Sequence, residues 1–182
     1  MDSPDAPRCT AWMRWIALLL SAALASTVPA VADGDRLDWP LRPRPAVTRA
    51  FDAPVQDWHP GHRGVDLAGT AGQPVFAAGA ATVVFAGLLA GRPVVSLAHP
   101  GGLRTSYEPV RAAVRAGQQV MAGTEIGALV AGHPGCSAAA CLHWGAMRGP
   151  ASRAHYVDPL GLLKSTPIRL KPLQPANATQ RQ

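Results

Sequence analysis

Three residues of this chain have the types and spacing to bind a metal ion. The segment GHRGVDL places His62 and Asp66 four residues apart. On a β-strand, residues of equal parity point to the same face, so both side chains can be directed toward one place. Gly64 lies between them on that face and has no side chain to fill the gap. The neighbouring Gly and Pro residues argue against a helix, which would also align these positions.

A second histidine in the segment CLHWG can complete such a site. His143 follows Cys141 by two residues, and we expect it to reach the same place from a neighbouring strand. Two imidazoles and one carboxylate suit zinc, and three protein ligands leave its fourth position to water. Such a water becomes acidic enough to attack a polarised carbonyl. A single His-x3-Asp pair is common by chance, so the spacing alone does not establish a metal site.

Residues 1–32 have the features of a cleavable secretory signal. Two arginines precede the apolar run WIALLLSAALA, and the small residues of Ala-Val-Ala end the segment at Ala32. The apolar run is shorter than the roughly 20 residues that a membrane-spanning helix needs, which argues against an anchor. We therefore expect cleavage after Ala32, secretion to the cell envelope (extracellular or periplasmic), and no stable membrane anchor afterwards.

Loss of the signal would leave two cysteines, because Cys9 departs with it. Cys136 and Cys141 are then an even count in an exported chain, which favours a disulfide. Two cysteines at this spacing could instead bind a metal, but export favours the bridge.

The chain is basic, with a net charge of +6. A basic exported protein is attracted to anionic envelope polymers or lipids, although the same charge can serve solubility alone. No basic run with interleaved aromatic residues occurs, so nucleic acid is not an expected partner.

Short β-type runs separated by Gly and Pro turns fill residues 51–163, and no amphipathic helix stands out. The runs predicted as strands are residues 74–77, 81–89, 93–98, 104–107, 118–121, 125–130 and 142–148. They predict a single all-β domain with an antiparallel sheet or sandwich. Residues 33–50 hold three prolines and are predicted as an extended lead-in that lays Trp39 against the domain. Residues 164–182, rich in Pro and Gln, are predicted as a disordered tail.

Several segments, in this order, resemble the LytM-type peptidase family, also called M23. They are GHRGVDLAG, QPVFAAGAATVVFAG, VVSLAHPGGLRTSYEPV, VRAGQQVMAGTEIGAL and CLHWGAMR, and they cover roughly residues 51–163. The resemblance implies an antiparallel β-fold with a groove and one zinc ion, used to cut peptide bonds in bacterial peptidoglycan. The family's zinc ligands fall on His62, Asp66 and His143, all of which are present.

Two catalytic histidines that the resemblance implies are replaced in this chain. The H-x-H motif begins with Cys141, and the T-x-Y-x-H stretch has Pro109 where its histidine should be. The resemblance implies that these histidines orient the attacking water and stabilise the charged tetrahedral intermediate. Loss of such a group typically costs about 10²–10⁴ in rate. Neither a proline nor a disulfide-bonded cysteine can act as a base.

Other residues are candidates to take over those tasks. His133 comes first, because the expected disulfide could hold it over the metal. His99 and Glu108 are weaker candidates, and Glu108 has the wrong strand parity unless the proline after it bends the chain. For each histidine the ordinary alternative is an unpaired surface side chain. Trp144 and Tyr107 are candidate substrate-binding residues, although burial in the core is the commoner role of such aromatic side chains.

These observations predict an exported zinc metalloendopeptidase that acts on peptidoglycan peptides with a modified catalytic set. The alternative is a binding module that keeps zinc for stability and binds wall peptides or activates another wall hydrolase. A biotinyl or lipoyl carrier domain, suggested by VRAGQQVMAGTEIGAL, is excluded. Such a domain needs a lysine at a hairpin tip, and the lysines here are Lys164 and Lys171 in the tail.

Overall fold

The computed structural model describes residues 36–56, 58–150 and 153–164. The expected signal segment and nearly all of the expected tail lie outside these residues. The described chain consists almost entirely of β-strands, which confirms the predicted all-β class. Its helical elements are single 3₁₀ turns, η1 (Pro100–Gly102) and η3 (Pro159–Leu162). No helix in this part of the chain has the length and hydropathy that crossing a membrane requires.

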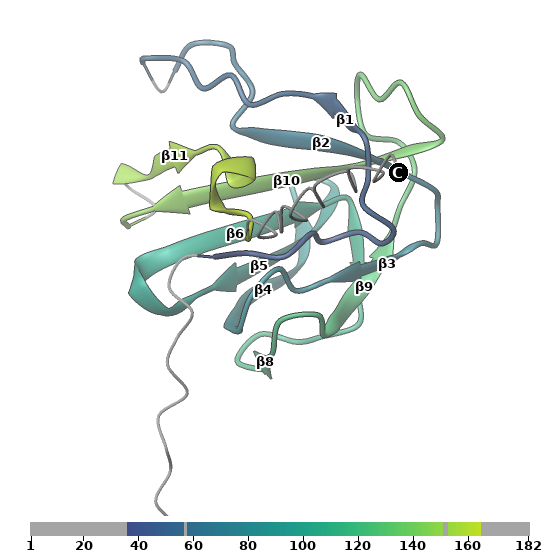
Figure 1. Ribbon diagram of the computed structural model, residues 1–182, viewed down its shortest axis with the longest axis vertical. Coiled ribbons are helices and arrows are strands. Elements are labelled where there is room, and N and C mark those ends of the chain that lie inside the picture. The colour runs from purple at the N-terminus through teal and green to yellow at the C-terminus, as the bar shows by residue number, and fades with distance from the viewer. Residues whose placement is uncertain (1–35, 57, 151–152, 165–182) are drawn as a thin grey trace, which may run out of the picture. The chain divides into compact units, whose positions relative to one another are not determined.

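The larger of two sheets is antiparallel and has the strand order β1-β2-β10-β6-β5-β4-β8, with β11 beside β10 (Figure 1). Its strands are β1 (Val47–Arg49), β2 (Gly64–Gly69), β4 (Ala81–Leu89), β5 (Arg92–Ala98), β6 (Leu103–Glu108), β8 (Gln119–Val120), β10 (Ala140–Arg148) and β11 (His155–Val157). The long strand β10 pairs with β6 along one edge and with β2 along the other. β2 and β10 therefore lie side by side near the middle of the sheet.

The smaller sheet has three antiparallel strands in the order β3-β9-β7. They are β3 (Pro74–Phe76), β9 (Glu125–Leu129) and β7 (Val110–Ala112). Val75 and Ile126 of this sheet belong to the same buried hydrophobic cluster as Leu97 and Trp144 of the larger sheet. The two sheets therefore share one core. Trp39 packs against it, as expected of the lead-in.

Strand β6 shows how the larger sheet separates an inner from an outer face. Its burial alternates along LRTSYE, with Leu103, Thr105 and Tyr107 buried and the residues between them partly exposed. Directly paired residues of neighbouring strands share a face. Because His143 pairs with both Glu108 of β6 and Asp66 of β2, these three side chains occupy the outer face together.

Candidate metal centre

The chain bends between His62 and Asp66. Strand β2 begins only at Gly64, and His62 forms an isolated bridge with Asp52. Along a straight strand four residues would span about 13 Å, at about 3.3 Å per residue. His62 Nε2 nevertheless lies 3.0 Å from Asp66 Oδ1. The expectation that equal parity on one strand aligns them is therefore corrected, because the bend brings the two side chains together.

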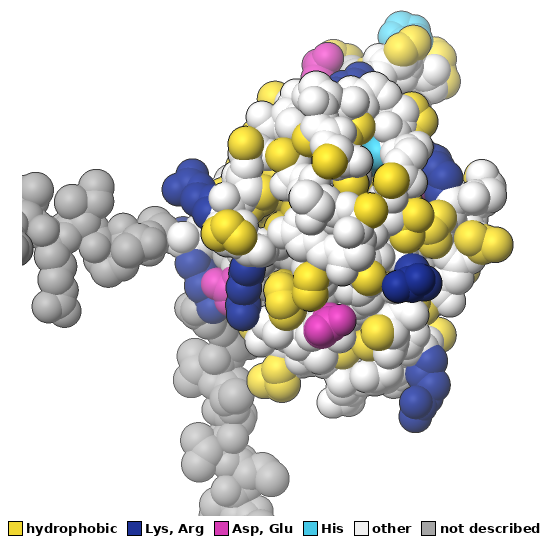
Figure 2. All heavy atoms as spheres, turned by 90° about the vertical axis from the view of Figure 1, so that its right-hand side faces the viewer, with side chains coloured by type: hydrophobic (Ala, Val, Ile, Leu, Met, Phe, Trp, Pro, Cys, Tyr) yellow, Lys and Arg dark blue, Asp and Glu magenta, His cyan; other side chains and the backbone are white. Residues whose placement is uncertain are grey.

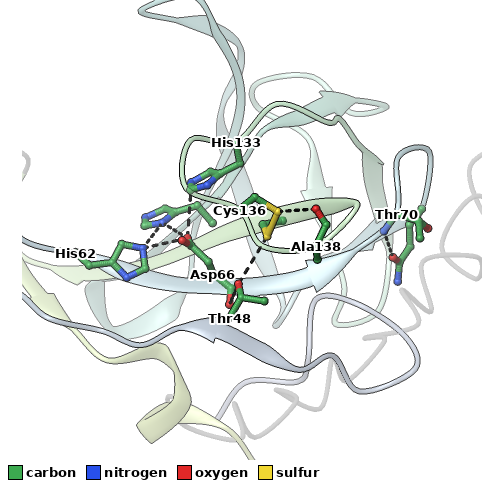
Figure 3. The surroundings of a disulfide bond; sticks show 10 residues. Thr48, His62, Asp66, Thr70, His133, Cys136 and Ala138 are labelled. Carbon is green, nitrogen blue, oxygen red and sulfur yellow. Dashed lines mark hydrogen bonds and ion pairs between the residues drawn. A yellow bond between two sulfur atoms is a disulfide. The ribbon is translucent and has the colours of Figure 1, made fainter.

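His143 completes the cluster from β10. Its Nδ1 atom lies 2.9 Å from Asp66 Oδ1 and 3.0 Å from His62 Nε2. Among the described residues, these three offer ligand atoms that all lie within 4.8 Å of one another. Figure 3 shows His62 and Asp66 pointing toward each other across the start of β2. The three ligands predicted from the sequence thus meet at one place.

The hydrogen bond of His62 to the backbone indicates that this cluster suits a cation. His62 Nδ1 lies 2.6 Å from the carbonyl oxygen of Ala50, to which it must donate. A neutral imidazole then directs an unshared electron pair from Nε2 toward the carboxylate oxygen of Asp66. Two electron-rich atoms at 3.0 Å repel unless a proton or a cation lies between them. The other carboxylate oxygen, Oδ2, is buried without a hydrogen-bond partner. The residues present therefore fit a zinc ion.

Gly64 makes room for the cluster, as its place in the motif predicts. A Cβ atom at this position would lie 2.6 Å from His143 Nε2 and 2.6 Å from the carbonyl oxygen of Trp144. Gly145, its partner on β10, is similarly close to Ser106, whose Oγ would lie 2.6 Å from an added Cβ. The imidazole of His143 therefore lies across two adjacent glycines.

The electrostatics keep Asp66 ionised. Burial alone would raise the pKa of this carboxyl, but the hydrogen bond from His143 and the charges of the surrounding histidines outweigh burial. The net effect lowers the pKa below its usual 3.8. Asp66 is consequently a carboxylate at neutral pH, as a metal ligand must be.

His133 lies over this cluster, at the position proposed for a substitute histidine. Its Nε2 is 3.6 Å from Asp66 Oδ1, and its side chain is only 8% exposed. Its ring is parallel to that of His143, with 5.8 Å between centroids. Burial lowers the pKa of His133 below 6.5, although the negative charges of Asp66 and Glu108 act in the opposite direction. His133 is therefore neutral at neutral pH, and its Nδ1 is buried without a partner.

Comparison with known proteins assigns this domain to one family. Residues 60–159 match the family model described as peptidase family M23. The chain belongs to peptidase family M23. It is 70% identical over 183 residues to the uncharacterized protein Rv2891 of Mycobacterium tuberculosis, covering 98% of this chain and 74% of that protein.

Solved structures that resemble this M23 domain include one from Helicobacter pylori and one from Staphylococcus simulans. Csd3 of Helicobacter pylori matches with a TM-score of 0.57 and 26% identity over 75% of this chain, which spans 37% of the Csd3 chain. The catalytic domain of the antimicrobial peptidase lysostaphin from Staphylococcus simulans matches with a TM-score of 0.54 and 26% identity. That match covers 66% of this chain and 93% of the lysostaphin domain. The shared part is therefore the M23 domain itself.

The M23 domain carries the predicted disulfide between Cys136 and Cys141. Cys141 is fully buried near the start of β10, with its Sγ 3.6 Å from Thr48 Oγ1. Cys136 lies in the loop before that strand, and Figure 3 shows the bridge beside Asp66 and His133. Because the sulfurs are bonded to each other, the alternative of a cysteine metal pair is excluded.

Trp144 and Tyr107 do not line a groove, and the expectation that they bind substrate is corrected. Both side chains are fully buried, because they alternate with the outward-facing residues of β10 and β6. Backbone N–H of Ala78 and the hydroxyl of Thr105 both donate to the Tyr107 hydroxyl. Burial raises the pKa of Tyr107 above 10.0. These two aromatic residues hold the strands that carry the site.

The two weaker substitutes are placed differently by the structure. His99 is mostly buried and its Nε2 lies 2.8 Å from Thr105 Oγ1, on the inner face of the sheet. Glu108 lies on the outer face opposite His143, 3.3 Å from Arg92 Nη1. The parity argument against Glu108 is therefore wrong, because Glu108 pairs directly with His143, whereas Pro109 is buried just after the end of β6. The alternation of Leu103, Thr105 and Tyr107, readable in the sequence, could have shown this.

Proposed function

We propose that this chain is a zinc-dependent endopeptidase that cleaves peptides of bacterial peptidoglycan in remodelling of the cell wall. Membership of peptidase family M23 and the cluster of His62, Asp66 and His143 support this proposal. The observation that carries it is the position of His133 beside that cluster. A neutral imidazole there answers the objection that both expected catalytic histidines are missing.

Three side-chain atoms would hold the zinc ion: His62 Nε2, Asp66 Oδ1 and His143 Nδ1. Zinc bound there supplies an acidified water and polarises the carbonyl to be attacked. The carbonyl of Ala50 fixes the tautomer of His62, so that its Nε2 remains available as a ligand.

In this proposal His133 moves the proton. Its imidazole is neutral at neutral pH because burial lowers its pKa, so it can accept a proton from the attacking water. The negative charge of Glu108 favours the imidazolium that results, since it acts to raise the pKa of His133. The same proton then goes to the leaving amine. Such general-base assistance contributes about 10²–10⁴ in rate.

The positive net charge of the protein suits the bacterial cell wall as its partner. The chain has a net charge of +6, and peptidoglycan-associated polymers are anionic. On the face shown in Figure 2, Lys and Arg side chains lie around the margins rather than in one continuous patch. This favours general attraction to an anionic polymer over binding of one discrete anion. The corresponding location is the cell envelope, reached by secretion.

The replacement of two histidines favours a second function. Cys141 is bonded to Cys136 and Pro109 is buried, so neither can move a proton. A domain of this kind would keep zinc for stability and would bind wall peptides or activate another wall hydrolase.

Chromatography of peptidoglycan after incubation with the zinc-loaded protein separates the two functions. Release of new muropeptides, lost in His62→Ala and in His133→Ala but kept in His155→Ala, is expected of the peptidase. His155 serves as the matched control because it is an exposed histidine on β11. Retention of the protein on the wall without any product would support the binding module and would reject hydrolysis.

A further inference from the structure

The loop between β9 and β10 carries His133 on little secondary structure of its own. Residues 131–139 contain no strand or helix, and most of them are exposed. His133, Cys136 and Ala138 are exceptions, since all three are partly buried. Gly132 and Gly135 flank the histidine with positive φ angles of 103° and 75°. A glycine-rich exposed loop has many alternative conformations, so something must select the one observed.

We propose that the Cys136–Cys141 disulfide is the positioning element of the site and fixes His133 over the metal cluster. The proposal deepens the function proposed above and rests on it. The resemblance places a histidine at residue 141, and here Cys141 stands there instead. By holding the loop, the bridge places the imidazole of His133 at the site in place of that histidine.

Through the disulfide, only a few residues connect His133 to the metal ligand His143. Cys136 follows His133 by three residues, and the backbone N–H of Cys136 donates to the carbonyl of His133 at 3.3 Å. Cys141 precedes the ligand His143 by two residues on the same face of β10. The disulfide therefore ties the loop of His133 directly to the strand that holds a ligand.

The other contacts of His133 restrain it weakly. Its ring stacks on His143 at 5.8 Å between centroids, and its Nε2 is 3.6 Å from Asp66 Oδ1. That second contact is beyond normal hydrogen-bond length and is weak for a neutral imidazole. Within the described part of the chain, no atom forms a hydrogen bond with its Nδ1. Without the bridge these contacts have to order the whole loop.

A general role in fold stability explains the bridge less well. The stabilisation that a disulfide provides grows with the length of the loop it closes. Cys136 and Cys141 are separated by only 5 residues, so this bridge closes a small ring. The ring includes none of the core strands of the smaller sheet. The disulfide therefore mainly restricts the conformation of the loop before β10.

Acylation of histidines by diethyl pyrocarbonate tests the placement without any need for catalysis. The bridge is removed in Cys136→Ser/Cys141→Ala and, with no substitution, by reducing the wild-type protein with a phosphine. His133 should then react faster by about tenfold or more, as expected when a side chain leaves protected structure. His99, mostly buried on the inner face, should stay unreactive in all samples. Unchanged protection of His133 would overturn the proposal.

A cycle of variants tests whether the bridge acts through His133. With the zinc-loaded protein, His133→Ala should lower kcat by about 10²–10⁴. Loss of the bridge should lower kcat by a similar factor with KM little changed. The combined variant should be no slower than His133→Ala alone, because one effect passes through the other. Losses that multiply would contradict this dependence.

Zinc affinity, measured by competition with a chromogenic chelator, completes the test. The ligands lie on β2, on β10 and before the bend, so loss of the bridge should leave affinity within about threefold. A larger loss would mean that His133 or the bridge holds the metal, and would overturn the positioning role. If the wild-type protein releases no peptide, the proposed peptidase function is rejected. The acylation experiment still shows whether the disulfide places His133.

Discussion

Gly64 is the residue on which the geometry of the metal ligands depends most directly. A Cβ atom there would meet His143 Nε2 and the carbonyl oxygen of Trp144, both at 2.6 Å. The second of these is backbone and cannot move without shifting β10. Gly64→Ala should therefore lower zinc affinity at least tenfold and destabilise the fold by about 1–3 kcal/mol, as overpacking does.

Gly161→Ala provides the matched control, because nothing lies within 4 Å of a Cβ atom at that position. Chelator competition and thermal unfolding measure the two effects. Equal behaviour of the two alanine variants would show that the contacts at Gly64 do not shape the site.

Tyr107 makes the stability of the fold depend on alkaline pH. Burial raises its pKa above 10.0, so the folded state keeps the phenolic proton at a pH where the unfolded chain loses it. Below pH 10 both states are protonated and stability is unaffected. As pH rises through 10 and above, stability falls by up to about 1.4 kcal/mol for each unit of pKa shift.

Denaturant unfolding between about pH 8 and pH 11 measures this dependence. Tyr107→Phe should be less stable at pH 8, because the N–H of Ala78 loses an acceptor, but should show a shallower alkaline decline. Parallel curves for the two proteins would rule out Tyr107 as the titrating group.

At the scale of strands, a buried hydrogen-bond chain joins elements that the core alone would not orient. His99, which follows β5, bonds to Thr105 on β6, and Thr105 bonds to Tyr107. Thr105→Val removes the hydroxyl that bonds to His99 Nε2 and donates to the Tyr107 hydroxyl. We expect a loss of about 1–3 kcal/mol in the free energy of unfolding by urea. Thr82→Val, on the partly exposed part of β4, should change stability by less than about 0.5 kcal/mol.

Strand existence was predictable where runs of apolar and β-branched residues end in Gly or Pro. All seven predicted strands occur, and no end differs by more than two residues. The predicted runs did not include β1, β2, β7 or β11. Strand β2 entered only through the spacing of His62 and Asp66, and the other three have three residues each, whose extended form depends on the partner strand. Tertiary pairing decides such short elements, and no local pattern encodes it.

The site was predictable in its ligands and less so in its surroundings. The motif identified His62, Asp66 and His143, yet it missed the bend that brings the first two together. Expecting His133 near the metal required the disulfide, which the cysteine count indicated. Glu108 was expected on the other face because its strand parity was counted from Pro109, whereas Glu108 itself pairs with His143. Side-chain direction therefore failed where a proline ended the strand.

At the scale of the whole molecule, one core serves both sheets and lies on the opposite face of β2 and β10 from Asp66 and His143. Its buried members come from strands across the fold, Val75 and Leu97 among them. The metal-free protein should therefore remain folded. Its thermal midpoint should rise with free zinc, because a ligand that binds only the folded state stabilises it by mass action.

Circular dichroism during heating, with chelator and at several zinc concentrations, measures that shift. Asp66→Asn should show little or none of it, since the variant lacks a charged ligand. Complete unfolding on chelation would contradict the expectation and would make zinc part of the core.

The disulfide between Cys136 and Cys141 also makes the arrangement of the site depend on the redox state of the compartment. Disulfides form in oxidising compartments, whereas a cytosol usually keeps thiols reduced. A copy still inside the cell would carry two thiols and an untethered His133. Under the function proposed above, such a copy would therefore lack a positioned His133 until it reached an oxidising compartment.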